Sequence, residues 1–152
     1  QDVEIQGAEL SSFFYFNDQW RLRSSVAYAR GENDRTGAHL DTIDPLNIVT
    51  GLRYDSGNGN WGGELLWTVV ANKDKVSSDT VTDSEGYAIL DLVGDLRIGD
   101  AVSLRAGVFN IFDEEYAIWQ SIQGLDKVQS ADTILNNYQP GTNLRVGLNI
   151  EF

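Results

Sequence analysis

The residues of this sequence that could do chemistry are few. His39 is the only histidine among 152 residues, and the chain has no cysteine. A hydrolytic triad needs a nucleophile, a base and an orienting acid, and we find no such set around a single histidine. We therefore expect that the protein is not an enzyme. The lack of cysteine also excludes disulfides and thiolate metal sites.

Two acidic groups could bind a cation. Carboxylates run consecutively at 113–115, and a looser group contains Asp79, Asp83 and Glu85. Carboxylate oxygens suit hard cations such as calcium, but the simpler interpretation of residues 113–115 is that they solvate the start of a loop. The spacing of the second group is not diagnostic. We therefore predict no metal site.

Three aromatic residues in one long polar stretch are candidate ligand contacts, namely Tyr116, Trp119 and Tyr138. They could contact an apolar ligand or a protein partner, because binding residues are often found on loops. They could equally pack their own loop against the rest of the protein, since aromatic side chains bury large apolar areas. The sequence leaves both interpretations open.

The charge balance narrows the class of partner. Acidic side chains number 23 and basic ones 11, giving a net charge of −12. A nucleic-acid partner needs a basic surface, and adsorption to anionic lipid needs basic residues too. No apolar run reaches the roughly 20 residues of a transmembrane helix. Membrane barrel strands, however, alternate in polarity and give only a weak hydropathy signal.

The regular elements of the chain are predicted to be β-strands. In the last ten residues, Leu144, Val146, Leu148, Ile150 and Phe152 alternate with polar residues and glycine, which is typical of a β-strand. We find no convincing amphipathic helix, and we expect a bulge at 109–111. Seven strand-like stretches cover residues 3–16, 19–30, 46–55, 61–72, 87–98, 102–112 and 143–152.

The connections between these stretches alternate between short and long. Residues 17–19, 56–60 and 99–101 are short, whereas 31–45, 73–86 and 113–141 are long. In an up-and-down meander all short turns would then share one rim, as in outer-membrane barrels. Stretches of 10 to 14 residues also exceed the usual five or six and suffice to cross a bilayer. We predict an all-β, antiparallel, up-and-down transmembrane barrel segment. The alternative is a soluble β-sandwich that serves as a binding or adhesin-like module.

The two faces of the predicted sheet differ in chemistry. Arginines gather opposite the apolar face, at 21, 23, 53, 97, 105 and 145, and their simplest partners are acids on the same face. Aromatic residues gather at the short-turn rim, where we predict a membrane girdle. These girdle residues are Phe14, Phe16, Trp20, Tyr54, Trp61 and Phe152.

Seven strands are an odd number, whereas single-chain bacterial barrels contain an even number. We therefore expect the chain to be part of a larger barrel, cut inside an extracellular loop. The short turns and the C-terminus would then lie in the periplasm.

Four stretches carry a family resemblance: G-A-H-L-D-T-I-D-P (37–45) leading to L-R-Y-D (52–55), Y-A-I-L-D-L (87–92), G-V-F-N-I-F-D-E-E-Y (107–116) and the last ten residues. With them, nearly the whole chain resembles the C-terminal third of the barrel of TonB-dependent outer-membrane receptors. The resemblance implies a Gram-negative outer-membrane transporter with a barrel of about 22 strands and a plug domain. Residues 1–152 would be the C-terminal barrel segment, without the plug or the segment that contacts the TonB complex.

Trp119, shortly after Tyr116, and the G-x-x-L-x-x-I-x-P pattern at 37–45 resemble the haem and haemoglobin branch of the family. The resemblance implies haem or another iron complex as the transported ligand, with no intrinsic cofactor. Siderophore, cobalamin and glycan receptors are the alternatives. His39 could ligate haem iron, but we favour a loop surface residue because the family usually lacks a histidine here. Phe152 resembles the C-terminal aromatic residue that the barrel-assembly machinery recognises.

Overall fold

A computed structural model describes residues 2–151. All seven strands form one antiparallel sheet, and the strands are ordered in space as they are in sequence. Their bounds are β1 Val3–Tyr15, β2 Trp20–Asn33, β3 Asn47–Asp55, β4 Trp61–Val70, β5 Tyr87–Ile98, β6 Val102–Phe109 and β7 Asn143–Ile150. The predicted up-and-down meander of seven strands is confirmed. The alternative two-sheet sandwich is wrong, because one sheet contains all seven strands.

The register explains the period-two pattern of the sequence. Side chains opposite one another on neighbouring strands lie on the same face, so one apolar residue per strand builds a continuous row. One such row crosses the whole sheet through Phe14, Leu22, Leu52, Leu65, Leu92, Val108 and Leu144. We call the side of this row the apolar face, and the side that bears the arginines the polar face.

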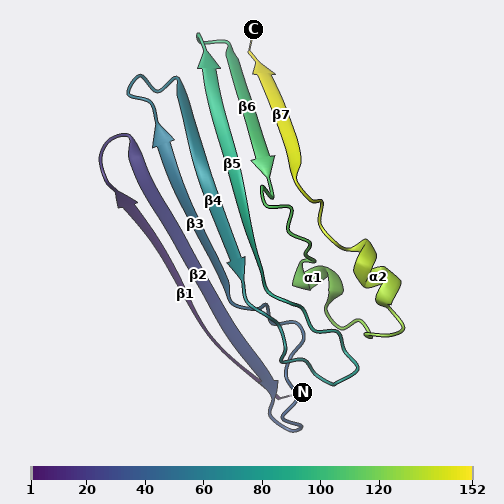
Figure 1. Ribbon diagram of the computed structural model, residues 1–152. Helices are drawn as coiled ribbons and strands as arrows, with labels where there is room; N and C mark the ends of the chain where they lie inside the picture. Colours follow the sequence, from purple (N-terminus) through teal and green to yellow (C-terminus); the bar gives the residue numbers. More distant parts are fainter. Residues whose placement is uncertain (1, 152) are drawn as a thin grey trace.

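Short and long connections lie at opposite ends of the sheet, as predicted (Figure 1). At the short-turn end the Asn17 side chain accepts hydrogen bonds from the backbone N–H groups of Gln19 and Trp20, both at 2.9 Å. Gly59 adopts a φ of +68° in the turn between β3 and β4, a conformation that glycine adopts without steric cost. The sequence chemistry of these turns therefore fits their short length.

Two predictions about local structure are wrong. The longest connection contains two short helices, α1 Trp119–Ile122 and α2 Ala131–Asn136, where no helix was expected. Within residues 2–151, no helix is long and apolar enough to cross a membrane. The predicted bulge at 109–111 is also absent, because β6 ends at Phe109 and Asn110 turns the chain with a φ of +51°.

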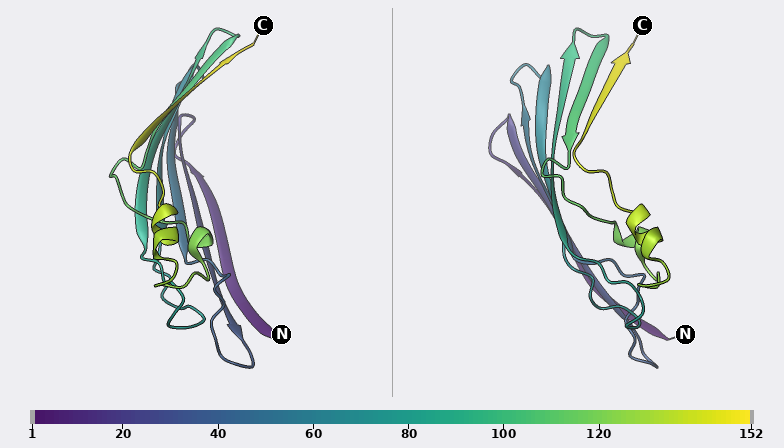
Figure 2. Two further views of the ribbon diagram at one scale, coloured as in Figure 1. Left: turned by 90° about the vertical axis from the view of Figure 1, so that its right-hand side faces the viewer. Right: turned by 45° about the vertical axis from the view of Figure 1, so that its right-hand side comes forward.

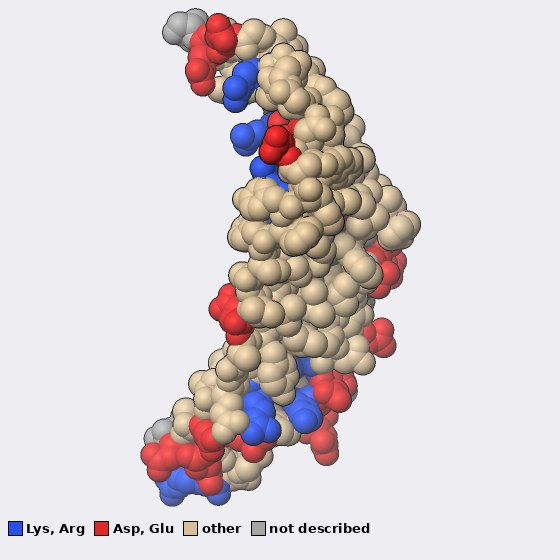
Figure 3. Space-filling view, turned by 90° about the vertical axis from the view of Figure 1, so that its left-hand side faces the viewer, with Lys and Arg blue, Asp and Glu red and all other residues tan. Residues whose placement is uncertain are grey.

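The sheet has almost no buried core of its own. All 13 residues of β1 are exposed, and Val70 is the only buried apolar residue within a strand among those described. The sheet is strongly twisted and curved (Figure 2). Seen from the β1 side, charged side chains gather near the two ends and at both margins of the view, and most of the surface between them is uncharged (Figure 3). This distribution suits a wall between two water-exposed ends, with the apolar face against lipid.

Candidate functional site

A groove of about 790 Å³ lies on the polar face at the long-loop end. Its floor is a row of side chains contributed by five successive strands: Glu9, Ala27, Asn47, Val70 and Tyr87. Small residues beside this row keep the floor low, since Gly7 and Ala29 also line the groove. The antiparallel register therefore brings together residues that are up to 78 positions apart in the sequence.

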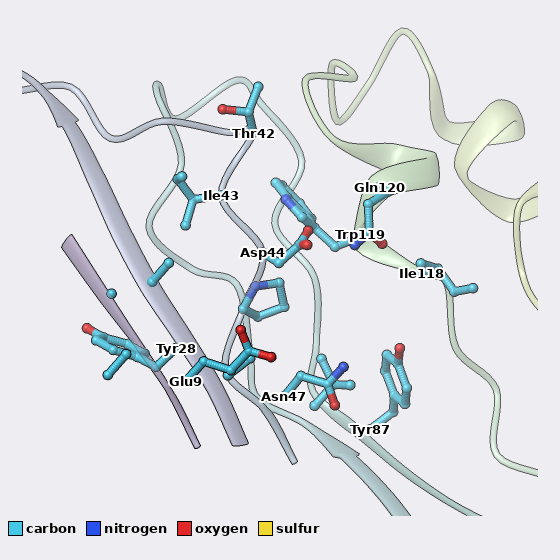
Figure 4. A pocket seen from close by; sticks show the side chains of 16 residues that line it. Glu9, Tyr28, Thr42, Ile43, Asp44, Asn47, Tyr87, Ile118, Trp119 and Gln120 are labelled. Atoms are coloured by element: carbon cyan, nitrogen blue, oxygen red, sulfur yellow. The ribbon is translucent and has the colours of Figure 1, made fainter. Parts of the chain in front are cut away.

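Two loop segments border the groove above this floor (Figure 4). Residues 42–45 approach from the connection between β2 and β3, and residues 118–120 approach from the connection between β6 and β7. The lining is mainly apolar or small, and its only ionisable acids are Glu9 and Asp44. A largely apolar cleft with a few polar groups is the usual form of a ligand site.

The three long loops pack together into one structure, which we call the loop unit (residues 34–46, 71–86 and 110–142). Asp41 is its central link. The Asp41 carboxylate accepts hydrogen bonds from the backbone N–H and the hydroxyl of Ser77, and its backbone carbonyl accepts one from the Trp119 indole at 2.8 Å. Ser77 and Trp119 belong to the other two loops, so one residue ties all three together.

An apolar cluster fills the loop unit. Ala117, Trp119 and Ile122 are 3 to 6% exposed, and Val76, Leu125 and Ile134 pack against them. Backbone hydrogen bonds join the same loops, from Thr82 N–H to Leu125 C=O at 2.8 Å and from Lys127 N–H to Thr80 C=O at 2.9 Å. Within residues 2–151 this is the only cluster of buried apolar residues.

Lys73 is a buried cation in the loop unit. It is 8% exposed, its Nζ lies 5.6 Å from the centre of the Trp119 ring, and it donates a long hydrogen bond of 3.5 Å to the Leu40 carbonyl. Burial lowers the pKa of Lys73, and the nearby carboxylates of Asp41, Asp44 and Asp74 oppose that shift. Its ammonium group therefore touches all three loops while being held away from water.

Asn110 anchors the two ends of the longest loop. It is 3% exposed, and its side chain accepts from the Glu114 N–H and donates to the Glu114 carbonyl, both at 2.9 Å. The Thr142 hydroxyl donates to the Asn110 carbonyl at 2.8 Å. The N-I-F-D-E-E-Y segment thus holds the end of β6 close to the start of β7.

One carboxylate of each acidic group forms a structural contact. An Asp113 carboxylate oxygen accepts a hydrogen bond from the Thr142 N–H at 2.8 Å, and Asp83 forms an ion pair with Lys127 at 3.2 Å. Across residues 2–151 no group of three or more ligand side chains is arranged to hold a metal ion.

The four candidate contact residues lie in different environments. Trp119 lines the groove, and the ring of Tyr116 stacks 4.2 Å from that of Tyr87 on the groove floor. Burial and the Asp91 carboxylate raise the pKa of Tyr116. Tyr138 is 44% exposed. His39 lies outside the groove, where its Nδ1 is 3.5 Å from a Glu32 carboxylate oxygen.

The polar face carries the expected ion pairs. Arg53 contacts Asp55 at 2.7 Å and Asp95 at 2.8 Å, and Arg23 contacts Glu64 at 2.6 Å. Arg21 pairs with Asp55 at 3.0 Å. Pairing with acids of the same face is therefore confirmed for three of the six arginines.

The aromatic residues at the short-turn rim form contacts across strands. The Tyr54 ring lies 4.9 Å from that of Trp20 and 5.0 Å from that of Trp61, and the rings of Phe14 and Phe16 are 4.9 Å apart. The membrane girdle itself stays a prediction. Phe152, the last residue predicted for the girdle, lies outside the described residues.

Sequence reasoning missed the residues of the groove floor and the role of Lys73. Glu9, Asn47 and Tyr87 lie on strands whose register cannot be read from the sequence. Their position in one row across the sheet could therefore not be predicted. Lys73 was noted only as a loop lysine. A signal for it exists in hindsight, because Asp41 and Asp44 of one loop and Asp74 of the next provide negative charge that favours the protonated form of a buried ammonium.

The sequence is similar to a known protein family and to several of its members. Residues 1–111 match the family model "TonB dependent receptor-like, beta-barrel". The chain is 27% identical to hemoglobin-binding protein A of Haemophilus influenzae over 97% of its length, and 27% identical to hemoglobin-haptoglobin utilization protein B of Neisseria meningitidis over 83%. It spans only 17% and 19%, respectively, of these two relatives.

Two solved structures share the fold. The copper transporter OprC superimposes with a TM-score of 0.85 at 28% identity, covering 99% of this chain and 24% of OprC. The ferric enterobactin receptor PfeA of Pseudomonas aeruginosa superimposes with a TM-score of 0.75 at 22% identity, covering 97% of this chain and 22% of the receptor. The family match extends over most of the sequence, and the seven-stranded sheet superimposes on both solved structures. The chain therefore belongs to the family of TonB-dependent receptor-like β-barrels.

Proposed function

We propose that this chain is the C-terminal barrel segment of an outer-membrane receptor that takes up haem or another iron complex. The family consists of outer-membrane transport receptors and not of enzymes, and it combines a membrane-embedded barrel with a plug. One relative named for haemoglobin binding and one named for haemoglobin-haptoglobin utilization support the choice of ligand. Because the chain spans about a fifth of those relatives, the plug and most of the barrel would be supplied by the rest of the protein.

The loop unit is the observation that carries this proposal. Barrel loops that only connect strands need no buried core, because loops normally run over a surface in contact with water. Here two of the three loops share an apolar cluster in which Trp119 is 3% exposed, and the third loop joins it through the Asp41 carbonyl, which accepts the indole hydrogen bond of Trp119. Such packing produces a pre-organised surface, which lowers the entropic cost of binding a large ligand. A packed loop unit beside a groove at the predicted extracellular end is what a receptor for a bulky ligand requires.

We propose the four candidate residues as ligand contacts. They differ in how accessible they are to a ligand. Tyr138 is exposed and can contact a ligand directly. Trp119 is buried and would reach a ligand only through the groove or after a loop movement. Tyr116 is half-buried and stacks on Tyr87 of the groove floor. The Nδ1 of His39 lies 3.5 Å from a Glu32 carboxylate oxygen, so Nε2 is the ring nitrogen that would contact a ligand.

A growth experiment tests the proposal. The full-length receptor is expressed in a Gram-negative strain that lacks haem receptors and siderophore synthesis, with haemoglobin, haemin or a ferric siderophore as the sole iron source. We expect growth on haemoglobin or haemin that depends on the receptor and on TonB. Growth restored only by the siderophore would overturn the haem assignment, and growth independent of TonB would overturn the transport mechanism.

Copper is the second candidate, because OprC has the higher TM-score of the two neighbours. Cu(I) sites favour thiolate and thioether ligands, and this sequence contains no cysteine, no methionine and one histidine. These 152 residues would therefore contribute few copper ligands. Receptor-dependent copper accumulation without growth on haemoglobin would favour this candidate over the iron complexes.

The orientation follows from the same proposal. The long loops would face the outside and the C-terminus the periplasm, with the aromatic girdle at the periplasmic lipid interface and Phe152 available to the barrel-assembly machinery. A peptide tag in the 110–142 loop should be labelled by antibody on intact cells, whereas a tag after Phe152 should need permeabilised cells. Labelling in the opposite pattern would reverse the topology. Deletion of Phe152 should lower the amount of assembled receptor.

A further inference from the structure

The groove between the strand floor and the loop unit carries negative charge and no positive charge. Its lining includes the carboxylates of Glu9 and Asp44 and no lysine, arginine or histidine. Glu9 belongs to the strand side of the groove, whereas Asp44 belongs to the loop segment above it (Figure 4). Both residues are exposed, and neither forms an ion pair within residues 2–151. The groove therefore offers two carboxylates to a ligand.

The buried cation of the loop unit does not neutralise this surface. Lys73 is 8% exposed and does not line the groove. Its Nζ donates to the Leu40 carbonyl and lies 5.6 Å from the centre of the Trp119 ring, so the ammonium group is engaged inside the loop unit. Asp44 interacts with Lys73 through charge without forming an ion pair. A cation inside the groove would therefore have to come from a partner.

The loops around the groove have the same sign of charge. The loop unit contains 12 acidic and 4 basic side chains, which gives it a net charge of −8 out of −12 for the whole chain. A cleft lined by one sign of charge and bounded by low-dielectric walls concentrates the electric field and attracts the opposite charge. Such a surface repels haem, which carries two carboxylates, and attracts a basic group.

The floor of the groove suits the hydrocarbon part of a basic side chain. Its lining includes the small or apolar residues Ala27, Ala29 and Val70 and the aromatic residues Tyr87 and Trp119. Lysine and arginine pack their hydrocarbon stems on apolar surface, and their cations are attracted to the faces of aromatic rings. A volume of about 790 Å³ is that of a site for a whole small ligand, so the groove admits a protruding side chain together with its neighbours.

We propose that the groove binds a lysine or arginine side chain that protrudes from the surface of a protein ligand. Its stem lies on the apolar floor and its cation contacts the carboxylates of Glu9 and Asp44. This inference rests on the proposed function and deepens it, because it assigns the groove to the protein that carries haem and not to haem itself. A protein is favoured over a small organic cation because the net charge of −8 extends over three loops, which complements an extended basic surface.

Binding measurements with the purified full-length receptor in detergent test this assignment. The probes are haemoglobin, haemin and a fluorescently labelled tetralysine peptide, each titrated at low ionic strength. Glu9→Gln with Asp44→Asn removes both charges of the groove and keeps the size of each side chain. We expect the Kd of haemoglobin and of the tetralysine peptide to rise roughly tenfold in this variant. The Kd of haemin should stay the same or fall, because a repulsive charge has been removed.

Glu4→Gln with Asp79→Asn is the matched control, because it also removes two exposed acidic charges. Glu4 lies on the opposite face of β1 from Glu9, since the two positions differ by an odd number, and Asp79 does not line the groove. The control should change each Kd by less than about twofold. At about 1 M salt the two double variants should become alike, since exposed charges are then screened. Heat-modifiable migration in electrophoresis verifies that each variant is folded.

Three results would overturn the inference. Equal effects of the two double variants would assign the attraction to the overall charge of the loops. A higher Kd of haemin in Glu9→Gln with Asp44→Asn would assign the groove to haem. An unchanged Kd of haemoglobin or of the tetralysine peptide in that variant would show that the groove binds no basic side chain. Since the tetralysine peptide requires neither haem nor uptake, failure of this assignment and failure of the proposed function are distinguishable.

Discussion

The sheet and the loop unit are stabilised in opposite ways. The sheet has a continuous ladder of hydrogen-bonded strands, yet its large apolar side chains are exposed, including Leu65 at 41% and Leu144 at 69%. The loop unit has little regular structure, yet it contains the only cluster of buried apolar residues among those described. The sheet therefore needs lipid for its apolar face, whereas the loop unit buries its own.

This difference has a consequence for function. In lipid, every backbone polar group of the wall must be paired, and the closed ladder of a barrel achieves this. Outside the lipid the hydrophobic effect acts again, so a loop structure can be built like a small globular core. The wall can thus stay constant while the loop unit changes its surface. Variants that affect one region should leave the other intact, and the predictions below test this independence.

The largest effect should come from Trp119→Ala. Truncation of a buried tryptophan costs about 3–5 kcal/mol, and it also removes the indole hydrogen bond to the Asp41 carbonyl. We expect hydrogen exchange to accelerate in all three loops together, while the amides of β2 to β5 keep their protection. Ile118→Ala is the matched control, because Ile118 is 36% exposed and should change little. Loss of protection in residues 110–142 alone would show that the loops are not one unit.

A substitution in the apolar row tests whether the apolar face of the sheet contacts lipid. Leu65→Arg on the lipid-facing side should destabilise the full-length barrel by about 2–4 kcal/mol, measured by urea unfolding in phospholipid vesicles. Leu66→Arg is the control, since Leu66 lies one position along β4 and on the polar face, opposite Gly51. Equal effects of both variants would mean that the apolar face does not contact lipid. Hydrogen exchange of the loop unit should stay unchanged in both.

Asn110 joins the two regions, and its loss should have an intermediate effect. In Asn110→Ala the partly buried backbone N–H and C=O of Glu114 lose their partners, at a cost of up to about 1–3 kcal/mol each. The positive φ at this position is also less favourable for alanine. We expect faster exchange at 110–116 and at Thr142, measured by mass spectrometry. The control is Asn137→Ala, a half-buried loop residue whose side chain makes one local bond to the Thr133 carbonyl. Unchanged hydrogen exchange in residues 110–116 would contradict the role of Asn110 in holding the two ends of the loop together.

The sequence predicted the wall well and the loop unit poorly, for a physical reason. A strand has a period of two residues, so Leu144 to Ile150 reveal their faces without any knowledge of their neighbours. The alternation of short and long connections then determines the order and direction of the strands. The bulge at 109–111 failed because Asn110 adopts its positive φ to satisfy Glu114 and Thr142, which are contacts that no periodicity encodes.

The loop unit could not be predicted because its contacts join distant residues without a repeat. Trp119 was identified as a candidate contact residue, but its burial depends on Asp41, 78 positions earlier in the chain. The short helices α1 and α2 are too short to show an amphipathic pattern. Without the register of the strands, the groove floor from Glu9 to Tyr87 was likewise invisible. Such sites require the fold before they can be recognised.

The smallest effect should be the pH dependence that Lys73 contributes to the loop unit. Burial lowers the pKa of Lys73 below 10.5, so between that lowered pKa and 10.5 the folded loops bind fewer protons than the opened loops do. The contribution of Lys73 to stability therefore rises as the pH increases through this window. Lys73→Met removes this contribution, and the difference in stability between the variant and the wild type should change across the same window.

Limited proteolysis of the full-length receptor measures this difference, with subtilisin cleavage of the 71–86 loop followed between neutral pH and pH 10.5. An unstructured peptide corrects for the pH dependence of the protease. Lys75→Met is the matched control, because Lys75 lies two positions away and is exposed, so its variant should follow the wild type at every pH. A pH dependence of Lys73→Met identical to that of the wild type would show that the buried ammonium does not stabilise or destabilise the loops through its charge. The loop unit would then depend on its apolar cluster and hydrogen bonds alone, which would sharpen its contrast with the lipid-dependent sheet.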